Sequence, residues 1–459
     1  MSYPTSLFSA NLKFDNSPVD LTQNDFSGAL SIAGCTATSL VKEFGSPLFV
    51  IDQEDFFRRT IAWQQALNES FGGGVLYYAA KSFICVEVAK WLIELDVNLD
   101  VCTGGELAVA LAANFPSNRI EFHGNNKSVA EIEQAISAGV GTIVLDSFIE
   151  IERVAKAAKA ANKVQNVYLR VTPGVEAHTH EFISTAHEDV KFGFSISSGA
   201  ALSAVEKCLT FDSLNLTGIH CHIGSQIFEV EGFTLAAERL VATLAQIRDK
   251  HGRELAELNI GGGYGIAYTT QESAISPESV LPVLAKVIKE ECAKLKLALP
   301  KISIEPGRAI VGPTTTTIYE VGTTKVVTLD DATTRTYVSV DGGMSDNIRP
   351  ALYGAKYSAF LANRKSTAKK VLSRIVGKHC ETGDILIFDI NLQSDITPGD
   401  LLAFPATGAY GRSMASNYNH MPRPAVVAVK DGTAKTILRR ETQADLLALD
   451  VIEAPRQLS

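Results

Sequence analysis

A lysine at the end of a short apolar segment has the clearest chemical potential in this sequence. Lys81 follows Val75-Leu-Tyr-Tyr-Ala-Ala80, a run whose length and composition predict a buried parallel strand. A lysine amine at the end of such a strand can form a Schiff base with a carbonyl compound. Most lysines in such positions are simply solvated, so the interpretation depends on the residues that accompany Lys81.

A glycine-rich segment, Asn259-Ile-Gly-Gly-Gly-Tyr-Gly265, lies at the end of the seventh of eight strand candidates. Closely spaced glycines let backbone N–H groups approach a phosphate, because no Cβ atom stands in the way. The spacing matches neither GxxxxGK[ST] nor GxGxxG, which disfavours a nucleotide. A tight turn is the alternative, and for a glycine run taken alone it is the better interpretation.

An acidic and a basic residue follow the eighth strand candidate, in Glu305-Pro-Gly-Arg308. As a surface ion pair they would mean little. In a site for pyridoxal phosphate (PLP), a carboxylate keeps the pyridine nitrogen protonated and makes the ring a strong electron sink. A guanidinium at the same place can bind a carboxylate or phosphate in fork geometry. Together with Lys81 and the glycines, this pair predicts a PLP enzyme.

Two histidines end the sixth strand candidate, in His220-Cys-His-Ile-Gly-Ser225. In an extended strand His220 and His222 share one face, and only one face of a barrel strand points inward. His222 could stack on a cofactor ring and Ser225 could donate to its phosphate. The alternatives are a metal pair or a hydrogen-bonded core histidine, and a metal is disfavoured because no third ligand with HExxH-like spacing accompanies them. Asp100, His123 and Arg170 lie at other strand ends, where spacing gives them no specific role.

Two further clusters lie outside this series of strands. Arg349 and Tyr353 are four residues apart, which allows one helical face. Lys378-His-Cys-Glu-Thr-Gly-Asp384 places the Cys380 thiol beside the Glu381 carboxylate in a turn. For an isolated cysteine, buried packing is the more common role.

Eight apolar strand candidates alternate with helical segments and would position these residues. A capping box at Ser128 and a periodic apolar face in the next segment support the helices. This pattern predicts a (β/α)8 TIM-type barrel over residues 49–312, with the site at the carboxyl ends of the strands. An open doubly wound sheet is the alternative. The strands are expected at Val75 to Ala80, Val97 to Cys102, Arg119 to Gly124, Thr142 to Ser147, Asn166 to Thr172, Leu216 to Ser225, Glu257 to Gly261 and Lys301 to Ile304.

After Pro313 the sequence changes to Thr- and Val-rich alternation with turn signals such as Pro398-Gly-Asp400, which predicts antiparallel β structure. Residues 313–459 are therefore expected to form a C-terminal antiparallel β-barrel domain, joined by residues 1–48. This domain would contribute substrate and partner-site residues.

Composition narrows the classes of function. The 459 residues carry a net charge of -9 without a basic run, so nucleic acid and anionic membranes are not expected partners. Seven scattered cysteines without a CxxC pair indicate neither a disulfide framework nor a zinc site and fit a reducing cytoplasm. We expect neither export nor membrane insertion.

The chain resembles the diaminopimelate decarboxylase family of fold type III PLP enzymes over nearly its whole length. The motifs are weak singly but specific in combination and order. They are Tyr78-Ala-Ala-Lys81, Phe122-His-Gly-Asn-Asn-Lys127, Lys191-Phe-Gly-Phe-Ser195, His220-Cys-His-Ile-Gly-Ser-Gln226, Gly261-Gly-Gly-Tyr-Gly265, Glu305-Pro-Gly-Arg308, His379-Cys-Glu-Thr-Gly-Asp384, and Gly408-Ala-Tyr410 with Ser416-Asn-Tyr-Asn419.

The resemblance implies a role for each motif. Lys81 would hold PLP and Cys380 would donate a proton, as the two catalytic residues. The other cofactor-binding residues would be Asp100, His222, Ser225, Gly261, Gly262, Gly263, Glu305, Arg308 and Tyr410. Substrate would be bound by Arg308, Arg349, Tyr353, Glu381 and Tyr410. The family's Cys-Glu loop comes from the other subunit, so a homodimer with shared active sites is implied, without a metal.

The implied reaction is the decarboxylation of meso-2,6-diaminopimelate to L-lysine and CO2, the last step of lysine biosynthesis. An ornithine- or arginine-type decarboxylase is the nearest alternative, although such relatives carry Asp where Glu381 follows Cys380 here. An amino-acid racemase of this fold pairs the pyridine nitrogen with Arg, against which Glu305 argues. A non-catalytic PLP-binding protein would lack the region of Cys380. The chain departs from the family pattern at Ser345 and at Lys356-Tyr357, which bears on loop geometry.

Overall fold

The computed structural model describes residues 9–15, 17–18, 27–175 and 191–451. These residues divide into two compact units. The first unit comprises Asp55–Ala267 and Gln271–Pro313. The second comprises the described parts of Phe8–Glu54, Tyr268–Thr270 and Thr314–Ser459.

The first unit is built around a closed ring of eight parallel strands. Each strand pairs in parallel with the next, and the pairings of β9 with β10 and of β14 with β6 complete the ring. This confirms the predicted barrel and excludes an open doubly wound sheet. The strands are β6 (Val75–Ala79), β7 (Asn98–Val101), β8 (Ile120–Phe122), β9 (Thr142–Leu145), β10 (Gln165–Thr172), β12 (Leu214–His220), β13 (Glu257–Asn259) and β14 (Lys301–Ile304), and β11 (Phe194–Ser195) adds to β10.

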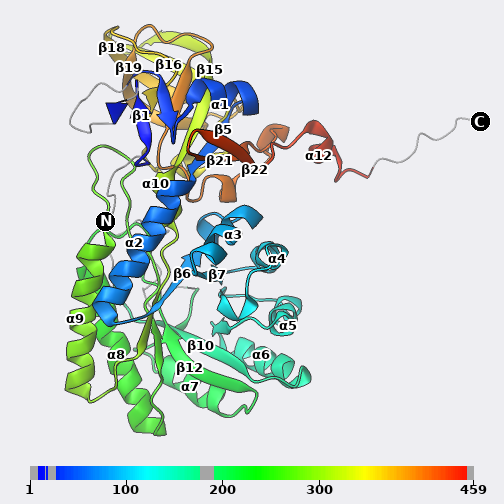
Figure 1. Cartoon of the computed structure of the whole chain (residues 1–459), viewed down its shortest axis with the longest axis vertical. Helices are drawn as coiled ribbons and strands as arrows, with labels where there is room; N and C mark the ends of the chain where they lie inside the picture. Colours follow the sequence, from blue (N-terminus) through cyan, green and yellow to red (C-terminus); the bar gives the residue numbers. More distant parts are fainter. Residues whose placement is uncertain (1–8, 16, 19–26, 176–190, 452–459) are drawn as a thin grey trace, which may run out of the picture. The chain divides into compact units, whose positions relative to one another are not determined.

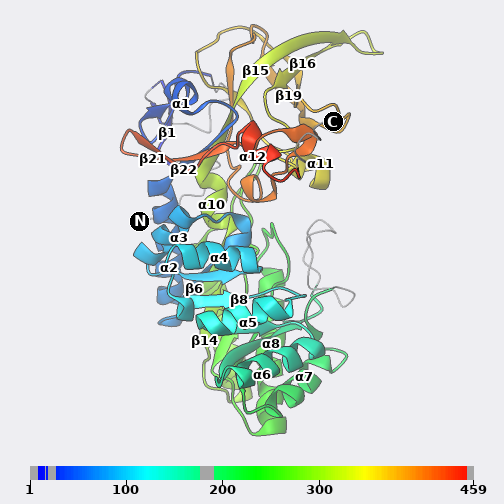
Figure 2. The ribbon, with the colours of Figure 1, turned by 90° about the vertical axis from the view of Figure 1, so that its right-hand side faces the viewer.

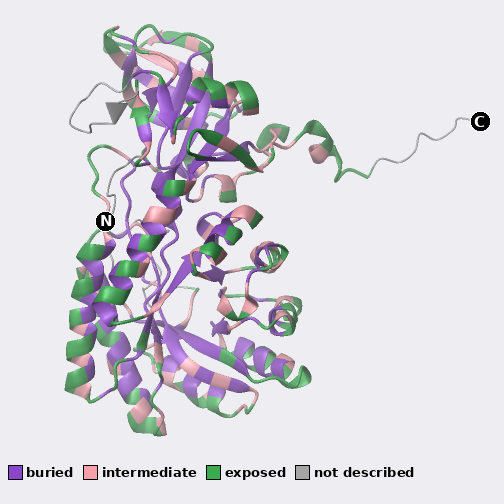
Figure 3. Ribbon diagram, viewed as in Figure 1, coloured by how far each residue is buried: buried purple, intermediate pink, exposed green. Residues whose placement is uncertain are grey.

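Helices surround the ring (Figures 1 and 2). The strands are buried, whereas the helices bury one side and expose the other (Figure 3), as an amphipathic pattern requires. The capping box expected at Ser128 is present and begins α5. The helices are α2 (Gln53–Phe71), α3 (Val86–Glu94), α4 (Gly104–Ala112), α5 (Val129–Ala138), α6 (Phe148–Ala160), α7 (Ala200–Leu209), α8 (Glu231–His251), α9 (Pro277–Leu295) and α10 (Arg308–Thr314).

The second unit contains a nine-stranded sheet and a smaller four-stranded one. The large sheet comprises β5 (Leu48–Asp52), β15 (Thr315–Thr328), β16 (Thr334–Val340), β17 (Phe360–Leu361), β18 (Lys370–Val376), β19 (Ile385–Gln393), β20 (Leu401–Phe404), β21 (Ala425–Lys430) and β22 (Thr433–Leu438). The small one comprises β1 (Leu12–Phe14), β2 (Ser17–Pro18), β3 (Leu30–Ile32) and β4 (Cys35–Thr36). The described part of this unit also contains the α-helices α1 (Ala37–Phe44), α11 (Arg349–Tyr353) and α12 (Gln443–Leu447) and two 3-10 helices, Arg412–Met414 and Tyr418–His420.

One long strand, β15, joins the two halves of the large sheet. Its first half pairs with β5 and β20, and its second half pairs with β16 after a register shift between Val321 and Thr323. Most pairings are antiparallel, as expected, but β16 with β18 and β5 with β21 are parallel. Alternation of apolar residues cannot reveal these two parallel pairs, because the side-chain period is the same in both arrangements.

Within the described residues, no helix is long and apolar enough to cross a membrane.

Candidate active site

Lys81 lies directly after the first barrel strand. The strand β6 ends at Ala79, and Lys81 lies in a short 3-10 turn, Ala80–Ser82. The last four residues of β6 are buried, whereas the Lys81 side chain is partly exposed. The Ser82 hydroxyl donates to the Ala79 carbonyl (2.8 Å), which fixes the turn. The structure therefore places Lys81 at the carboxyl end of the barrel, where TIM-barrel active sites form.

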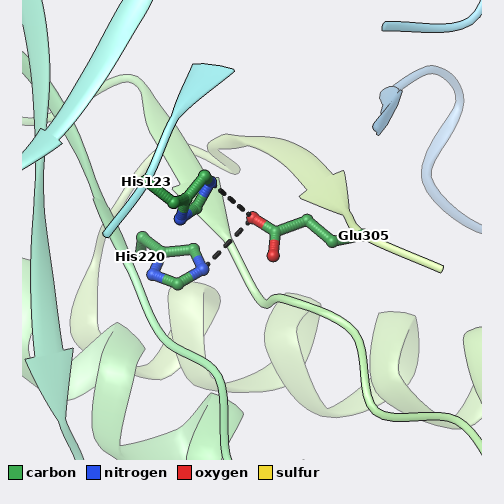
Figure 4. Close-up of side chains that lie close together, drawn as sticks. All are labelled: His123, His220 and Glu305. Carbon is green, nitrogen blue, oxygen red and sulfur yellow. Dashed lines mark ion pairs between the residues drawn. The ribbon is translucent and has the colours of Figure 1, made fainter. Parts of the chain in front are cut away.

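Three buried side chains meet at this end of the barrel (Figure 4). Glu305 Oε1 lies 3.2 Å from His123 Nε2 and 3.1 Å from His220 Nε2. His123 Nε2 also lies 3.7 Å from Asp100 Oδ1. The three residues of Figure 4 could ligate a metal ion, since one ligand atom from each lies within 4.8 Å of the others. The absence of a metal therefore stays a prediction.

The protonation of this cluster follows from its burial and its charges. Burial by itself raises the pKa of Glu305, but His123 and His220 outweigh it and hold that pKa well below its usual value. Burial lowers the pKa of His123, but Asp100 and Glu305 outweigh it and raise that pKa to about 10. At His220 burial outweighs the opposing effect of Glu305 and lowers the pKa to about 4. Near neutral pH the cluster thus contains an ionised Glu305, a protonated His123 and a neutral His220.

Asn259, the last residue of β13, connects this cluster to the glycine segment. Its Nδ2 donates to Glu305 Oε1 (2.7 Å) and to Glu121 Oε2 (3.0 Å), and its Oδ1 accepts from the Gly261 N–H (2.9 Å). One buried amide therefore holds both the carboxylate and the start of the loop.

The glycine-rich segment after β13, called the glycine loop from here on, has no room for side chains. A Cβ atom on Gly261, Gly262 or Gly263 would lie 2.2–2.3 Å from a backbone carbonyl oxygen. Gly261 and Gly263 also have φ values of 71° and 111°, which L side chains rarely adopt. A tight turn, the alternative interpretation, would not require glycine at all three positions. The close packing of this backbone against its neighbours does require it.

His222 and Ser225 lie beyond the end of their strand. The prediction of one strand from Leu216 to Ser225 is wrong at its end, because β12 stops at His220. His222 and His220 therefore do not share a strand face. His222 Nδ1 instead accepts from the Gly262 N–H (3.3 Å), and Ser225 Oγ accepts from Arg308 Nη2 (2.9 Å). These two contacts bring the His222 loop against both the glycine loop and the start of α10.

The polar atoms at this end fit PLP. Asp100 Oδ2 and His220 Nδ1 are buried without a hydrogen-bond partner, which is costly unless a further group enters the site. The ionised Glu305 suits a protonated ring nitrogen, and the narrow glycine loop suits a phosphate. Of the predicted site residues in this unit, the structure brings together Lys81, Asp100, His222, Ser225, Gly261, Gly262, Gly263, Glu305 and Arg308.

The second unit contains a buried cation, Arg349, at the start of α11. Its guanidinium carbon lies 4.4 Å from the ring centroid of Tyr268, and its Nη1 donates to the Tyr357 hydroxyl (2.5 Å). All three residues are buried. Among the described residues, none of the carboxylates forms an ion pair with Arg349. A buried guanidinium with only aromatic partners is suited to an anionic ligand.

Cys380 and Glu381 are exposed on a turn of the second unit. The Cys380 N–H donates to Asn419 Oδ1 (3.3 Å), and Glu381 Oε2 lies 3.5 Å from the Tyr418 hydroxyl. Exposure of Cys380 contradicts the buried-packing role that is usual for an isolated cysteine.

Two further predicted residues of this unit, Tyr353 and Tyr410, are half-buried. Tyr353 ends α11, one turn after Arg349. Tyr410 has a φ of 60°, a left-handed conformation that is rare for a bulky side chain and is often kept at functional sites.

Glu121 and Asn259 were not predicted as parts of the site, and neither His123 nor His220 was assigned a specific role in it. One signal was available: Glu121 lies on β8 and His123 follows the last residue of that strand, so the two are two residues apart and would face the same side if the strand continued. The side of the barrel they face depends on closure of the ring, which the strand alone does not encode.

Comparison with known proteins agrees with this geometry. Residues 53–312 match the family described as "Pyridoxal-dependent decarboxylase, pyridoxal binding domain". A diaminopimelate decarboxylase of Mycobacterium tuberculosis is 52% identical over 94% of this chain and 96% of its own, and that of Bacillus subtilis is 45% identical over 92% and 95%.

Solved structures show the same fold. The crystal structure of diaminopimelate decarboxylase from M. jannaschii has a TM-score of 0.86 at 31% identity, covering 97% of this chain and 98% of its own. That of the Helicobacter pylori enzyme in complex with L-lysine has a TM-score of 0.80 at 29% identity, covering 90% and 98%. With the Lys81 strand end, the ionised Glu305 and the glycine loop, these matches show that the chain belongs to the diaminopimelate decarboxylase family of PLP-dependent lyases.

Proposed function

We propose that this chain decarboxylates meso-2,6-diaminopimelate at its D centre, giving L-lysine and CO2. The observation that carries the proposal is Glu305, buried against His123 and His220 at the same barrel end as Lys81 and the glycine loop. Bound PLP supplies a ring that accepts the electron pair left on the α-carbon when CO2 departs. An anionic partner for the ring nitrogen favours that role, whereas a racemase would place an arginine there.

The residues of the barrel would bind and orient the cofactor. Lys81 would hold its aldehyde carbon, and His222 would lie against its ring. Glu305 would keep a proton at the pyridine nitrogen, and His123 keeps Glu305 ionised. The Ser225 hydroxyl and the amides of the glycine loop would bind the phosphate, together with Tyr410 of the second unit.

The residues of the second unit would select the substrate. The distal end of diaminopimelate is itself an amino acid, so it needs one cationic and one anionic partner. Arg349, a buried cation without an acidic partner among the described residues, would bind the distal carboxylate together with Arg308 of the first unit, and Tyr353 would contact the substrate. The exposed Glu381 would bind the distal ammonium, and Cys380 would deliver a proton to the α-carbon after CO2 has left.

We further propose a cytoplasmic homodimer with shared active sites, in which residues 49–312 bind the cofactor. The exposure of Cys380 and Glu381 supports this arrangement, because a turn that presents a thiol and a carboxylate outward can serve a second copy of the chain. None of the seven cysteines, all of which the structure describes, forms a disulfide, which suits a reducing compartment.

Product analysis tests the proposed reaction. The purified protein with added PLP is incubated with meso-diaminopimelate, L-ornithine or L-arginine, and amine products and CO2 are quantified. We expect one CO2 and one L-lysine per diaminopimelate consumed. Preference for ornithine or arginine would reject the substrate, and interconversion of diaminopimelate stereoisomers without CO2 would identify a racemase.

A further inference from the structure

The turn that carries Cys380 is held by the residue before it. His379 is buried, whereas Cys380 is exposed. The His379 ring lies 3.1 Å from Asn419 Oδ1 through Nδ1 and 2.8 Å from Ser345 Oγ through Nε2. These contacts come from segments 34 and 40 residues away in the sequence, so the ring joins three parts of the second unit.

The hydrogen bonds decide which ring nitrogen carries the proton. The Cys380 N–H donates to Asn419 Oδ1 (3.3 Å), so the Asn419 atom that faces the turn must be its oxygen. An oxygen there can only accept, which makes His379 Nδ1 a donor. In the neutral ring Nε2 is then an acceptor, and the Ser345 hydroxyl donates to it.

The backbone of the turn is fixed independently. The His379 N–H donates to Asp384 Oδ2 (2.8 Å), and Met344 N–H donates to Asp384 Oδ1 (2.6 Å). Asp384 thus closes the turn on the segment that contains Ser345. Asn419 has a φ of 51°, a conformation that asparagine tolerates better than most residues. The peptide that presents the Cys380 thiol is held in this frame through its N–H bond to Asn419.

We propose that His379 is a positioning residue for Cys380: its ring, a donor at Nδ1 and an acceptor at Nε2, anchors the Asn419 oxygen that also holds the Cys380 N–H. The inference rests on the proposed role of Cys380.

When CO2 leaves, the C–C bond breaks and its electron pair stays on the substrate carbon. The thiol proton then forms the new C–H bond, and the thiolate regains a proton from water. Delivery from one face requires a fixed thiol.

Two substitutions separate the two ring contacts. The amide of His379→Asn reaches about as far as Nδ1 and can keep the bond to Asn419, whereas that of His379→Gln reaches about as far as Nε2 and can keep only the bond to Ser345. His379→Gln should therefore lower kcat by about 10-fold to 100-fold, and His379→Asn by less. KM and bound PLP should stay unchanged. His420→Asn, at an exposed histidine, is the matched control and should keep the wild-type rate.

The stereochemistry of proton delivery provides a second readout. Reaction in D2O places one deuterium on the carbon that loses CO2, and the wild-type enzyme should give one configuration. His379→Gln should give a mixture of configurations, because water then reaches the carbon from both faces. Retention of one configuration and of the wild-type kcat in His379→Gln would overturn the inference. Equal losses in both His379 variants together with a lowered Tm would also overturn it, since they indicate a general structural role.

The variant Cys380→Ala separates the two levels of the proposal. If Cys380→Ala keeps the wild-type rate and configuration, the role assigned to Cys380 fails. If Cys380→Ala scrambles the label and His379→Gln does not, only the His379 inference fails. Should His379→Gln not fold, Ser345→Ala replaces it: loss of the donor to Nε2 should scramble part of the label, and a fully retained configuration would refute the inference.

Discussion

The Tyr357 hydroxyl offers a sharp test of how substrate is selected. It accepts a 2.5 Å hydrogen bond from Arg349, whose guanidinium also lies over the Tyr268 ring. The change Tyr357→Phe removes this one oxygen and keeps the aromatic ring. Arg349 then loses a buried hydrogen-bond partner while it keeps its charge, so its orientation becomes less defined.

The size of the effect follows from the kind of bond. A hydrogen bond to a charged group contributes about 1–2 kcal/mol net here. The larger contributions known for such bonds are not expected, because the substrate can partly replace the Tyr357 hydroxyl as a partner of Arg349. If this energy positions Arg349 for the distal carboxylate, KM for diaminopimelate should rise about 5-fold to 30-fold. The reacting carbon is not touched, so kcat should stay within about twofold.

Steady-state kinetics with a matched control measure this effect. Tyr337→Phe also removes a hydroxyl that accepts from an arginine, Arg374, through a longer 3.4 Å contact on another part of the unit, and should leave KM unchanged. An unchanged KM in Tyr357→Phe, or a loss confined to kcat, would refute the assignment of Arg349 to the distal carboxylate.

Three further predictions concern the barrel end. Gly262→Ala places a Cβ 2.2 Å from the Glu305 carbonyl oxygen and should weaken PLP binding at least about tenfold, measured as the cofactor retained after dialysis. The control is Gly105→Ala, whose Cβ would come no closer than 3.7 Å to another group and which should bind PLP as the wild type does. Glu305→Gln should bind PLP but lose about a hundredfold or more in kcat, and near-normal turnover would contradict its role at the ring nitrogen. The pKa of His123 is raised from 6.5 to about 10, so its contribution to stability is complete below about pH 6.5 and is lost as pH rises through about 10. The difference in Tm between the cofactor-free protein and its His123→Gln variant should accordingly become smaller from pH 7 to pH 10. A difference that becomes larger would contradict a protonated His123 at neutral pH.

The barrel could be predicted because its signals are local. Each strand is a short apolar run between polar residues, and helices such as α5 begin at a recognisable cap. Lys81, Glu305 and the three glycines stood out because each follows such a run directly. The second unit was less predictable, since β15 divides its pairing between two halves of one sheet and two strand pairs are parallel.

The end of β12 shows why boundaries escape a pattern of alternation. The polar and apolar residues after His220 continue to alternate, yet the strand stops there. The segment next to β12 at this point is the glycine loop, whose Gly261 and Gly263 pack against the carbonyls of Cys221 and Gly224. Regular pairing ends because the partner backbone turns, which depends on residues 40 positions further along the chain.

The hydrogen-bonded roles of Asn259 and His379 are of the same long-range kind. Each residue type is unremarkable in sequence, and its role depends on partners brought close by folding. Asn259 meets Glu121 across the barrel. His379 meets Ser345, which lies 34 residues earlier in the chain.

The covalent link between Lys81 and PLP is the claim on which the account depends. Reduction of the PLP-loaded protein with borohydride, followed by proteolysis and mass spectrometry, locates that link directly. We expect the pyridoxyl mass on the peptide that contains Lys81, and loss of this labelled peptide in Lys81→Ala. Labelling of a different lysine in the wild-type protein, or retention of the visible absorbance of lysine-bound PLP in Lys81→Ala, would contradict the account.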